Sequence, residues 1–192
     1  MKRREDIEYA NELLPDYAGF ILAKGRRRTV SPMQMEELAA HLDARVQRVG
    51  VFVDQSIDWI ADLARNDLID VIQLHGHETQ EDIRQLKRVT DKTIVKAFRV
   101  TGAEICREAE ASEADLVLLD AGTGDGKTFD WTFISGIRRK FFLAGGLSPD
   151  NVSEAVAQVH PWAVDVSSGV ETDGDKDFEK MKAFVRAVRQ NT

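Results

Sequence analysis

The chain has 192 residues, a formal net charge of -7, 43% hydrophobic residues and 31% charged residues. This composition is that of a soluble globular protein, and no apolar run approaches the roughly 18 residues that a membrane helix needs. The acidic balance argues against nucleic acid as the main partner. The single cysteine, Cys106, excludes an internal disulfide framework, and with no secretory signal visible it predicts a cytoplasmic setting.

Strand-like and helix-like segments alternate from the start of the chain. The spacing of Ile7, Ala10 and Leu13 predicts a first amphipathic helix that ends at Pro15. Ser31, followed by a proline, is a helix-capping residue for a second helix over 31–43. Seven apolar runs read as strands, each followed by a helical pattern: 17–23, 48–53, 71–75, 93–100, 116–121, 140–146 and 163–169. The sequence therefore predicts seven strands and eight helices.

This alternation predicts an α/β fold with a parallel sheet, either an open doubly wound sheet or a closed eight-fold barrel. Seven strands, with one more expected ahead of the first helix, fit the TIM (β/α)8 barrel lacking its first β-strand. The chain is also slightly short of the usual size of about 250 residues. No low-complexity linker divides the sequence, so we expect one domain over residues 1–192. In such barrels the chemistry lies in the loops after the strands.

Two glycine- and serine-rich stretches come directly after the last two predicted strands. Gly145 and Gly146 allow close backbone approach to a ligand, and Ser167 and Ser168 offer hydroxyl and amide donors. The seventh and eighth loops of such barrels are their usual phosphate site. The alternative is that both stretches are only tight turns.

Asp120 ends the predicted strand 116–121, where partial desolvation can raise a carboxyl pKa enough for acid catalysis. The alternative is a capping or loop-ordering aspartate. The segment 121–128, AGTGDGKT, is a near miss for a phosphate-binding P-loop, because Ala121 stands where the first glycine should be. We therefore disfavour a nucleotide site there.

Two loops after earlier strands carry basic residues. The stretch GRRRT, 25–29, holds three arginines, whose planar fork suits a carboxylate; a solvated basic loop is the alternative. The stretch HGHE, 75–78, has metal-like spacing but no second ligand cluster. We interpret His75 as a substrate-binding residue and His77 as a solvated one.

The motifs RRRTVSP, VIQLHG, VLLDAGTGDGKTFDW, LAGGLSPDNV and AVDVSSGVE occur in the order and spacing of phosphoribosylanthranilate isomerase, so the chain resembles that family over essentially all 192 residues. The resemblance implies a cofactor-free and metal-free Amadori rearrangement of N-(5-phosphoribosyl)anthranilate in tryptophan biosynthesis. It also implies a role for each site residue: Asp120 as general acid, Arg28 for the anthranilate carboxylate, His75 and Asp165 lining the site, and Gly145, Gly146, Ser167 and Ser168 for the phosphate.

The resemblance departs from the family at one point. Family members begin with a strand like KICG, whose cysteine is the general base, and the segment MKRREDI of this chain resembles the family's next segment, directly after that strand. Cys106 lies in a predicted helix on the outside of the barrel, so we interpret it as a packing residue. The sequence thus predicts an isomerase that is impaired by loss of its base.

Two other functions remain open at this point. One is a non-catalytic barrel remnant that still binds phosphosugars, and the other is a different phosphosugar barrel enzyme. For partners we expect a small phosphorylated substrate, with neither nucleic acid nor membrane. We expect the complete form to be a monomer and the chain lacking the strand to form a dimer or a segment-swapped assembly.

Overall fold

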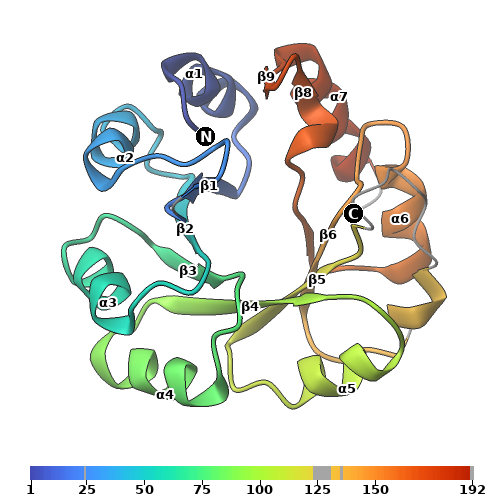
Figure 1. The fold of residues 1–192 in the computed structure, drawn as a ribbon. Helices are drawn as coiled ribbons and strands as arrows, with labels where there is room; N and C mark the ends of the chain where they lie inside the picture. The colour runs from blue at the N-terminus through green and yellow to red at the C-terminus, as the bar shows by residue number, and fades with distance from the viewer. Residues whose placement is uncertain (24, 123–130, 135, 191–192) are drawn as a thin grey trace. The chain divides into compact units, whose positions relative to one another are not determined.

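The computed structural model describes residues 1–23, 25–122, 131–134 and 136–190. It forms two compact units, the first Met1–Lys96 with Glu113–Asp115, the second Ala97–Ser112 with Leu116–Thr192. Seven parallel strands follow one another in chain order, β1 to β7 (Figure 1). This confirms the predicted α/β fold with seven parallel strands. None of the described helices is long and apolar enough to cross a membrane.

The first unit alternates helices and strands in the predicted order. Each of its neighbouring strand pairs is parallel, with Gly19 opposite Val49, Val49 opposite Val71 and Val71 opposite Thr93. The helices lie on one side of these strands (Figure 1). The elements are α1 Arg4–Leu13, β1 Tyr17–Ile21, α2 Pro32–Ala39, β2 Gln47–Phe52, α3 Ile57–Arg65, β3 Val71–Leu74, α4 Gln80–Val89 and β4 Thr93–Arg99, which continues into the second unit.

Side-chain capping explains where two of these helices, α2 and α4, begin. Ser31 caps α2 as predicted: its hydroxyl accepts the N–H of Gln34, and Pro32 occupies the first turn. Thr79 caps α4 in the same way, because its hydroxyl accepts the N–H of Asp82 while the carboxylate of Asp82 accepts the N–H of Thr79. These reciprocal bonds fix the point at which each loop ends.

The core of the first unit lies between its strands and helices. Its largest fully buried side chains come from both layers: Ile7, Phe20, Met35, Phe52, Ile60, Ile72, Leu74, Ile83, Leu86 and Ile94. Burial of this apolar surface, at about 25 cal/mol per Å², is the main term that stabilises the unit.

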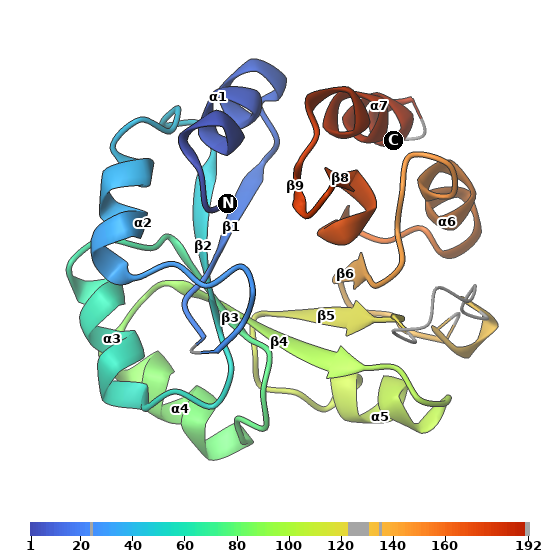
Figure 2. The same ribbon diagram turned by 45° about the horizontal axis from the view of Figure 1, so that its top comes forward.

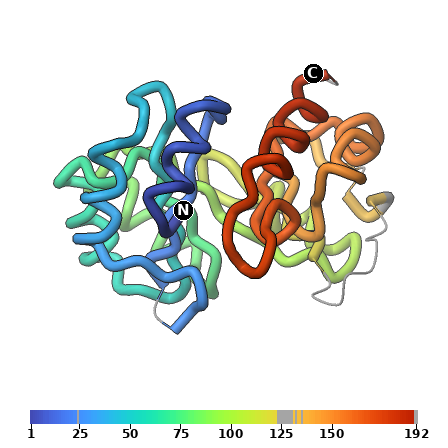
Figure 3. The backbone as a smooth tube through the Cα atoms, turned by 90° about the horizontal axis from the view of Figure 1, so that it is seen from above, coloured from blue at the N-terminus to red at the C-terminus, as the bar shows by residue number. Residues whose placement is uncertain are grey.

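The second unit contains the remaining elements. Helix α7 lies beside α6 (Figures 2 and 3). Strands β5 and β6 are parallel, with Asp120 opposite Ala144, and β7 pairs with β6. The elements are α5 Glu104–Glu110, β5 Leu116–Asp120, η1 Trp131–Ile134, β6 Phe141–Ala144, α6 Val152–Val159, β7 Ala163–Val164, η2 Ser168–Val170, β8 Glu171–Thr172, β9 Asp175–Lys176 and α7 Phe178–Arg189.

The prediction of eight helices was wrong for the described residues, which contain seven α-helices. Where the sixth crossover helix was expected, the described part is the short 3-10 helix η1. Its run Trp131–Ile134 consists of aromatic and β-branched residues, which lose side-chain freedom in an α-helix. The antiparallel pair β8–β9 was not predicted; its turn uses Asp173 and Gly174, both with positive φ.

Candidate active site

The predicted site residues fall into two groups, one in each compact unit. Arg28 and His75 belong to the first unit. The second unit contains all the others: Asp120, Gly145, Gly146, Asp165, Ser167 and Ser168. Within the second unit, every one of these residues lies at or just after the carboxyl end of β5, β6 or β7.

Asp120 is the last residue of β5 and is half-buried. Its backbone carbonyl accepts the N–H of Val100 at 2.9 Å, and its Oδ1 accepts the N–H of Gly122 at 2.9 Å. The next residue, Ala121, donates to the carbonyl of Ala144 at 2.8 Å, which continues the β5–β6 ladder beyond the strand end. Backbone pairing and a turn at Gly122 therefore hold the carboxylate at the edge of the sheet.

Gly145 lies directly against that carboxylate. Its φ of +92° is a conformation that favours glycine. A Cβ atom there would overlap Oδ1 of Asp120 and the nitrogen of Gly122, and would lie 2.7 Å from the carbonyl carbon of Ala121. The predicted acid and the first predicted phosphate-binding glycine are thus neighbours, and only a residue without a side chain allows this contact.

The loop after β6 turns on Gly146 and is closed by Asn151. Gly146 has a φ of +67°, is exposed, and has open space where a side chain would project. The amide of Asn151 donates to the Gly146 carbonyl at 3.0 Å, and its Oδ1 accepts the N–H of Ser148 at 2.8 Å. Asn151, which was not predicted from the sequence, therefore fixes both sides of this turn.

Gly169 joins the two glycine- and serine-rich loops. A Cβ on Gly169 would overlap the carbonyl oxygen of Leu147 and would lie 2.9 Å from its carbonyl carbon and 3.1 Å from the Cα of Ser148. The exposed Ser167 and Ser168 just before it are thereby brought beside the loop 145–148. We call residues 145–148 with 167–169 the glycine–serine cradle.

Lys176 supports the cradle from the β8–β9 hairpin. Its ammonium donates to the carbonyl oxygen of Ser167 at 2.8 Å and lies 3.5 Å from a carboxylate oxygen of Glu171. The side chains of Lys176 and Glu171 are only 12% and 6% exposed. Lys176 was not predicted as a site residue; its only signal in the sequence is a lysine shortly after VSSGVE.

Asp165 lies two residues before the cradle serines. Its N–H donates to the carbonyl of Leu143 at 2.8 Å, which prolongs the β6–β7 pairing, and the residue is half-buried. Asp165 thus comes directly after β7, whereas Asp120 is the last residue of β5.

In the first unit, Arg28 occupies a loop that Thr29 closes. The N–H of Thr29 donates to the Arg26 carbonyl at 3.1 Å, and its hydroxyl accepts the N–H of Arg26 at 3.2 Å. Arg26 and Arg27 are exposed, whereas Arg28 is half-buried. Among the three arginines, Arg28 is therefore the one whose position is most restricted.

His75 follows β3 and is held through backbone and ring. Its N–H donates to the Phe52 carbonyl at 2.8 Å, and its Nδ1 lies 3.0 Å from Nε2 of Gln73. His77, by contrast, has a 97% exposed side chain that contacts Asp54. Hydrogen bonds from the backbone N–H and then the ring of His77 lower the pKa of Asp54. Across the described residues, no cluster of three metal-ligating side chains occurs.

Cys106 lies on α5 and is buried. Its Sγ donates to the Phe133 carbonyl at 3.1 Å. Burial, with a smaller effect from Glu110, raises the pKa of the thiol. These features agree with the interpretation of Cys106 as a packing residue.

Most of the motif GKTFDW, 126–131, and of the P-loop-like stretch 121–128 lies outside the described residues.

A model of the N-(5'phosphoribosyl)anthranilate (PRA) isomerase family matches residues 1–187. The chain belongs to the PRA isomerase family. It is 42% identical over 196 residues to the N-(5'-phosphoribosyl)anthranilate isomerase of Thermoanaerobacter sp. (strain X514), with 98% of this chain and 95% of that protein covered.

Solved structures of PRA isomerases are similar in fold. That of the Thermotoga maritima enzyme has a TM-score of 0.90 and 34% identity, covering 99% of this chain and 96% of that one. Another, a complex with reduced 1-(o-carboxyphenylamino)-1-deoxyribulose 5-phosphate, has a TM-score of 0.86 and 32% identity, covering 99% and 95%. The family is one of intramolecular oxidoreductase-type isomerases, and its fold is TIM-barrel-like.

Proposed function

We propose that this chain carries the substrate-binding and acid-catalytic residues for converting N-(5'-phosphoribosyl)anthranilate to 1-(o-carboxyphenylamino)-1-deoxyribulose 5-phosphate in tryptophan biosynthesis. The observation that carries the proposal is the direct packing of Asp120 against Gly145, next to the joined loops of the glycine–serine cradle. A carboxyl group and an anion-binding turn side by side suit a sugar phosphate whose ring must be protonated. Family membership supplies the reaction.

Each predicted residue has a role in this proposal. The cradle residues Gly145, Gly146, Ser167 and Ser168 bind the phosphate through backbone N–H groups and hydroxyls. Arg28 binds the anthranilate carboxylate, which its two parallel N–H groups can match. His75 and Asp165 contact the substrate.

Asp120 donates a proton to the ribose ring oxygen, so that the C1–O bond breaks and the nitrogen lone pair forms a C1=N double bond. A base then removes the proton from C2, which gives an enol. Tautomerisation moves a proton to C1 and leaves a carbonyl at C2, so C1 is reduced, C2 is oxidised and no external electron acceptor is needed. The burial and hydrogen bond of Cys106 argue against its serving as that base.

We further propose that the base is a cysteine on a KICG-like strand ahead of the segment MKRREDI, that the 192 residues alone have impaired turnover, and that they fold as one domain. The competing proposal is a phosphosugar-binding barrel without catalysis. Comparing the chain with a version that has a KICG-like strand joined ahead of Met1 separates them. If only the extended chain isomerises the substrate, the base assignment holds; if neither form does, the non-catalytic proposal is favoured.

Asp120→Asn in the extended chain tests the acid. The amide has no proton to give to the ring oxygen, so we expect kcat/KM to fall by roughly 10²- to 10⁴-fold, measured from the change in anthranilate fluorescence. Asp58→Asn, an exposed change in the first turn of α3, is the matched control and should leave the rate unchanged. Near-parent activity of Asp120→Asn would overturn the assignment.

A further inference from the structure

A buried ion pair lies under the loop that carries His75. Lys96 on β4 and Glu78 before α4 have side chains only 7% and 3% exposed, and Nζ of Lys96 lies 2.9 Å from Oε2 of Glu78. Lysine and glutamate are almost never fully buried unless they are paired. Apolar residues can often replace a buried ion pair without loss of stability. We therefore ask whether this pair fixes the conformation of the loop.

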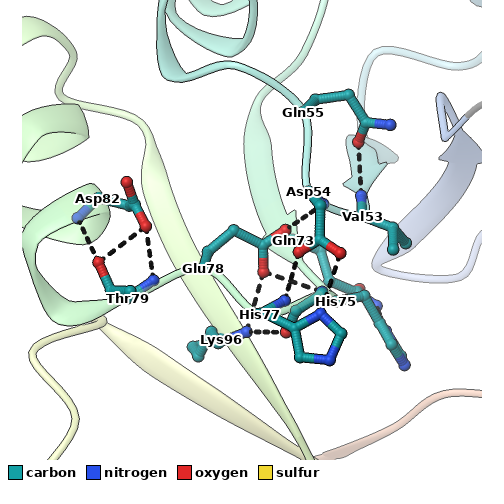
Figure 4. A network of polar contacts seen from close by, with 11 residues as sticks. Val53, Asp54, Gln55, Gln73, His75, His77, Glu78, Thr79, Asp82 and Lys96 are labelled. Carbon is teal, nitrogen blue, oxygen red and sulfur yellow. Dashed lines mark hydrogen bonds and ion pairs between the residues drawn. The ribbon is translucent and has the colours of Figure 1, made fainter.

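The pair holds both polar groups of one peptide residue, Gly76. Oε2 of Glu78 accepts the Gly76 N–H at 2.9 Å, and Nζ of Lys96 donates to the Gly76 carbonyl at 2.7 Å. The second carboxylate oxygen, Oε1, accepts the N–H of Asp54 at 2.9 Å; Figure 4 shows Glu78 between Lys96 and Asp54. One carboxylate thus ties together the loop after β2 and the loop after β3, while the ammonium ties the latter to β4.

Gly76 directly follows His75, so these bonds restrict the histidine from its C-terminal side. A Cβ on Gly76 would lie 2.7 Å from both the Cγ and the nitrogen of Asp54, which shows how closely the two loops pack. On its other side, His75 is held by its N–H bond to Phe52 and by the contact of its ring with Gln73. The imidazole therefore projects from a backbone that is fixed at both ends.

We propose that Lys96 and Glu78 are positioning residues, whose buried pair fixes the peptide after His75 and thereby the orientation in which the imidazole meets the substrate. This rests on the proposed function only in that His75 contacts the ligand. A rotated imidazole would lose its hydrogen bond to the ligand even though His75 itself is unchanged.

Three variants separate positioning from stability. Glu78→Gln keeps the size of the side chain and one acceptor oxygen. Lys96→Met removes the donor to Gly76 and leaves a buried carboxylate unpaired, whereas the double variant leaves no buried charge and should recover part of the stability lost in Lys96→Met. Arg48→Met is the matched control. It breaks the Arg48–Asp70 pair, with Nη2 2.6 Å from Oδ1, at the opposite, amino-terminal ends of β2 and β3.

Two readouts are measured on the 192-residue chain. One is the NMR signal of the His75 ring, assigned with His75→Asn. The other is the dissociation constant of reduced 1-(o-carboxyphenylamino)-1-deoxyribulose 5-phosphate, from calorimetry. We expect both Lys96 variants and Glu78→Gln to shift the His75 signal and to weaken binding about tenfold, the loss of roughly one hydrogen bond. The double variant should stay weak despite its recovered stability, and Arg48→Met should bind as the parent does.

Unchanged His75 signals and affinity in variants of lowered thermal midpoint would overturn the positioning role. If Lys96→Met does not fold, Glu78→Gln and the double variant decide the question. If the parent itself does not bind the probe, the proposed function fails, and the His75 signal still decides whether the pair positions the ring. The positioning role would also be overturned if Arg48→Met lost as much affinity as the Lys96 variants, because the weaker binding would then follow from lowered stability in general.

Discussion

The glycine–serine cradle and the loop of His75 are held in place by opposite means. In the cradle, the absence of side chains at Gly145 and Gly169 lets backbone segments touch each other and the Asp120 carboxylate. In the loop 75–78, two buried charged side chains, Lys96 and Glu78, hold the backbone through directed hydrogen bonds. The cradle should therefore be most sensitive to added atoms, and the His75 loop to removed ones.

Gly145→Ala is the strongest test of this difference. The added methyl group would overlap Oδ1 of Asp120 and the Gly122 nitrogen at a φ of +92°, so backbone strain adds to the steric overlap. We expect the free energy of unfolding to fall by about 3 kcal/mol or more, and turnover of the extended chain to be lost as Asp120 is displaced. Urea denaturation and the isomerase assay measure the two effects.

Gly146→Ala is its matched control. Gly146 also has a positive φ, but no atom lies within 4 Å of the position that a Cβ would take. We therefore expect the free energy of unfolding to fall only by the cost of placing alanine at a positive φ, about 1 kcal/mol. Equal losses in the two variants would mean that steric contact at Gly145 is unimportant, and that the cradle is not packed as described.

Much of the cradle could be predicted from the sequence, because a site formed by backbone groups requires glycine and serine at particular positions in the loops. Glycine pairs and serines directly after apolar strands predict both where the chain turns and which loops meet, since parallel strands end at one edge. The same reasoning located Asp120 at the end of β5. Strand positions were predictable for the same reason: a buried parallel strand is a continuous apolar run.

The supports of both sites could not be predicted in this way. Lys96 is a charged residue within an otherwise apolar strand. Its partner Glu78 lies 18 positions earlier, and the sequence around Lys96 does not indicate this pairing. Glu78 itself was part of a metal-like pattern, HGHE, whereas in the structure it accepts backbone N–H groups. Lys176 likewise bonds to Ser167 from the β8–β9 hairpin. The strands of this hairpin have only two residues each, which is too short for a recognisable strand pattern in the sequence. Pairings between separate elements depend on packing, which composition and periodicity do not encode.

Arg28→Ala tests the substrate-binding loop of the first unit. Removing a guanidinium that makes charge-assisted hydrogen bonds should raise KM of the extended chain by about 10- to 100-fold. A fall in kcat would follow where the sugar is misplaced. Arg27→Ala is the control, because Arg27 is exposed whereas Arg28 is half-buried. A larger effect of Arg26→Ala or Arg27→Ala would show that another arginine of the loop binds the carboxylate.

Lys176→Met tests whether the cradle also depends on a side-chain hydrogen bond. If it does, the difference between the cradle and the His75 loop is smaller. Loss of the 2.8 Å bond to the Ser167 carbonyl should let the serine loop move and weaken binding of inorganic phosphate about tenfold, as measured by calorimetry. The thermal midpoint should also fall, because Glu171 keeps a carboxylate that is only 6% exposed.

Lys182→Met is the control for Lys176→Met. Lys182 is exposed on α7, with its ammonium 5.6 Å from the ring centre of Phe178, and it should have no effect on phosphate binding. Parent-like phosphate affinity in Lys176→Met would show that the packing of Gly169 against Leu147 suffices to hold the cradle.

Cys106→Ala should have the smallest effect, because Cys106 belongs to neither region. Burial raises the pKa of its thiol, so the thiolate, which is the form that could act as a base or nucleophile, is scarce near neutral pH. We expect kcat/KM of the extended chain to be unchanged and the free energy of unfolding to fall by about 1 kcal/mol, from the lost sulfur contacts and the Phe133 hydrogen bond. Iodoacetamide should accordingly alkylate the folded chain much more slowly than the urea-unfolded chain. A large loss of turnover in Cys106→Ala, together with fast alkylation of the folded protein, would instead make this thiol the base and would require α5 to place it against the substrate.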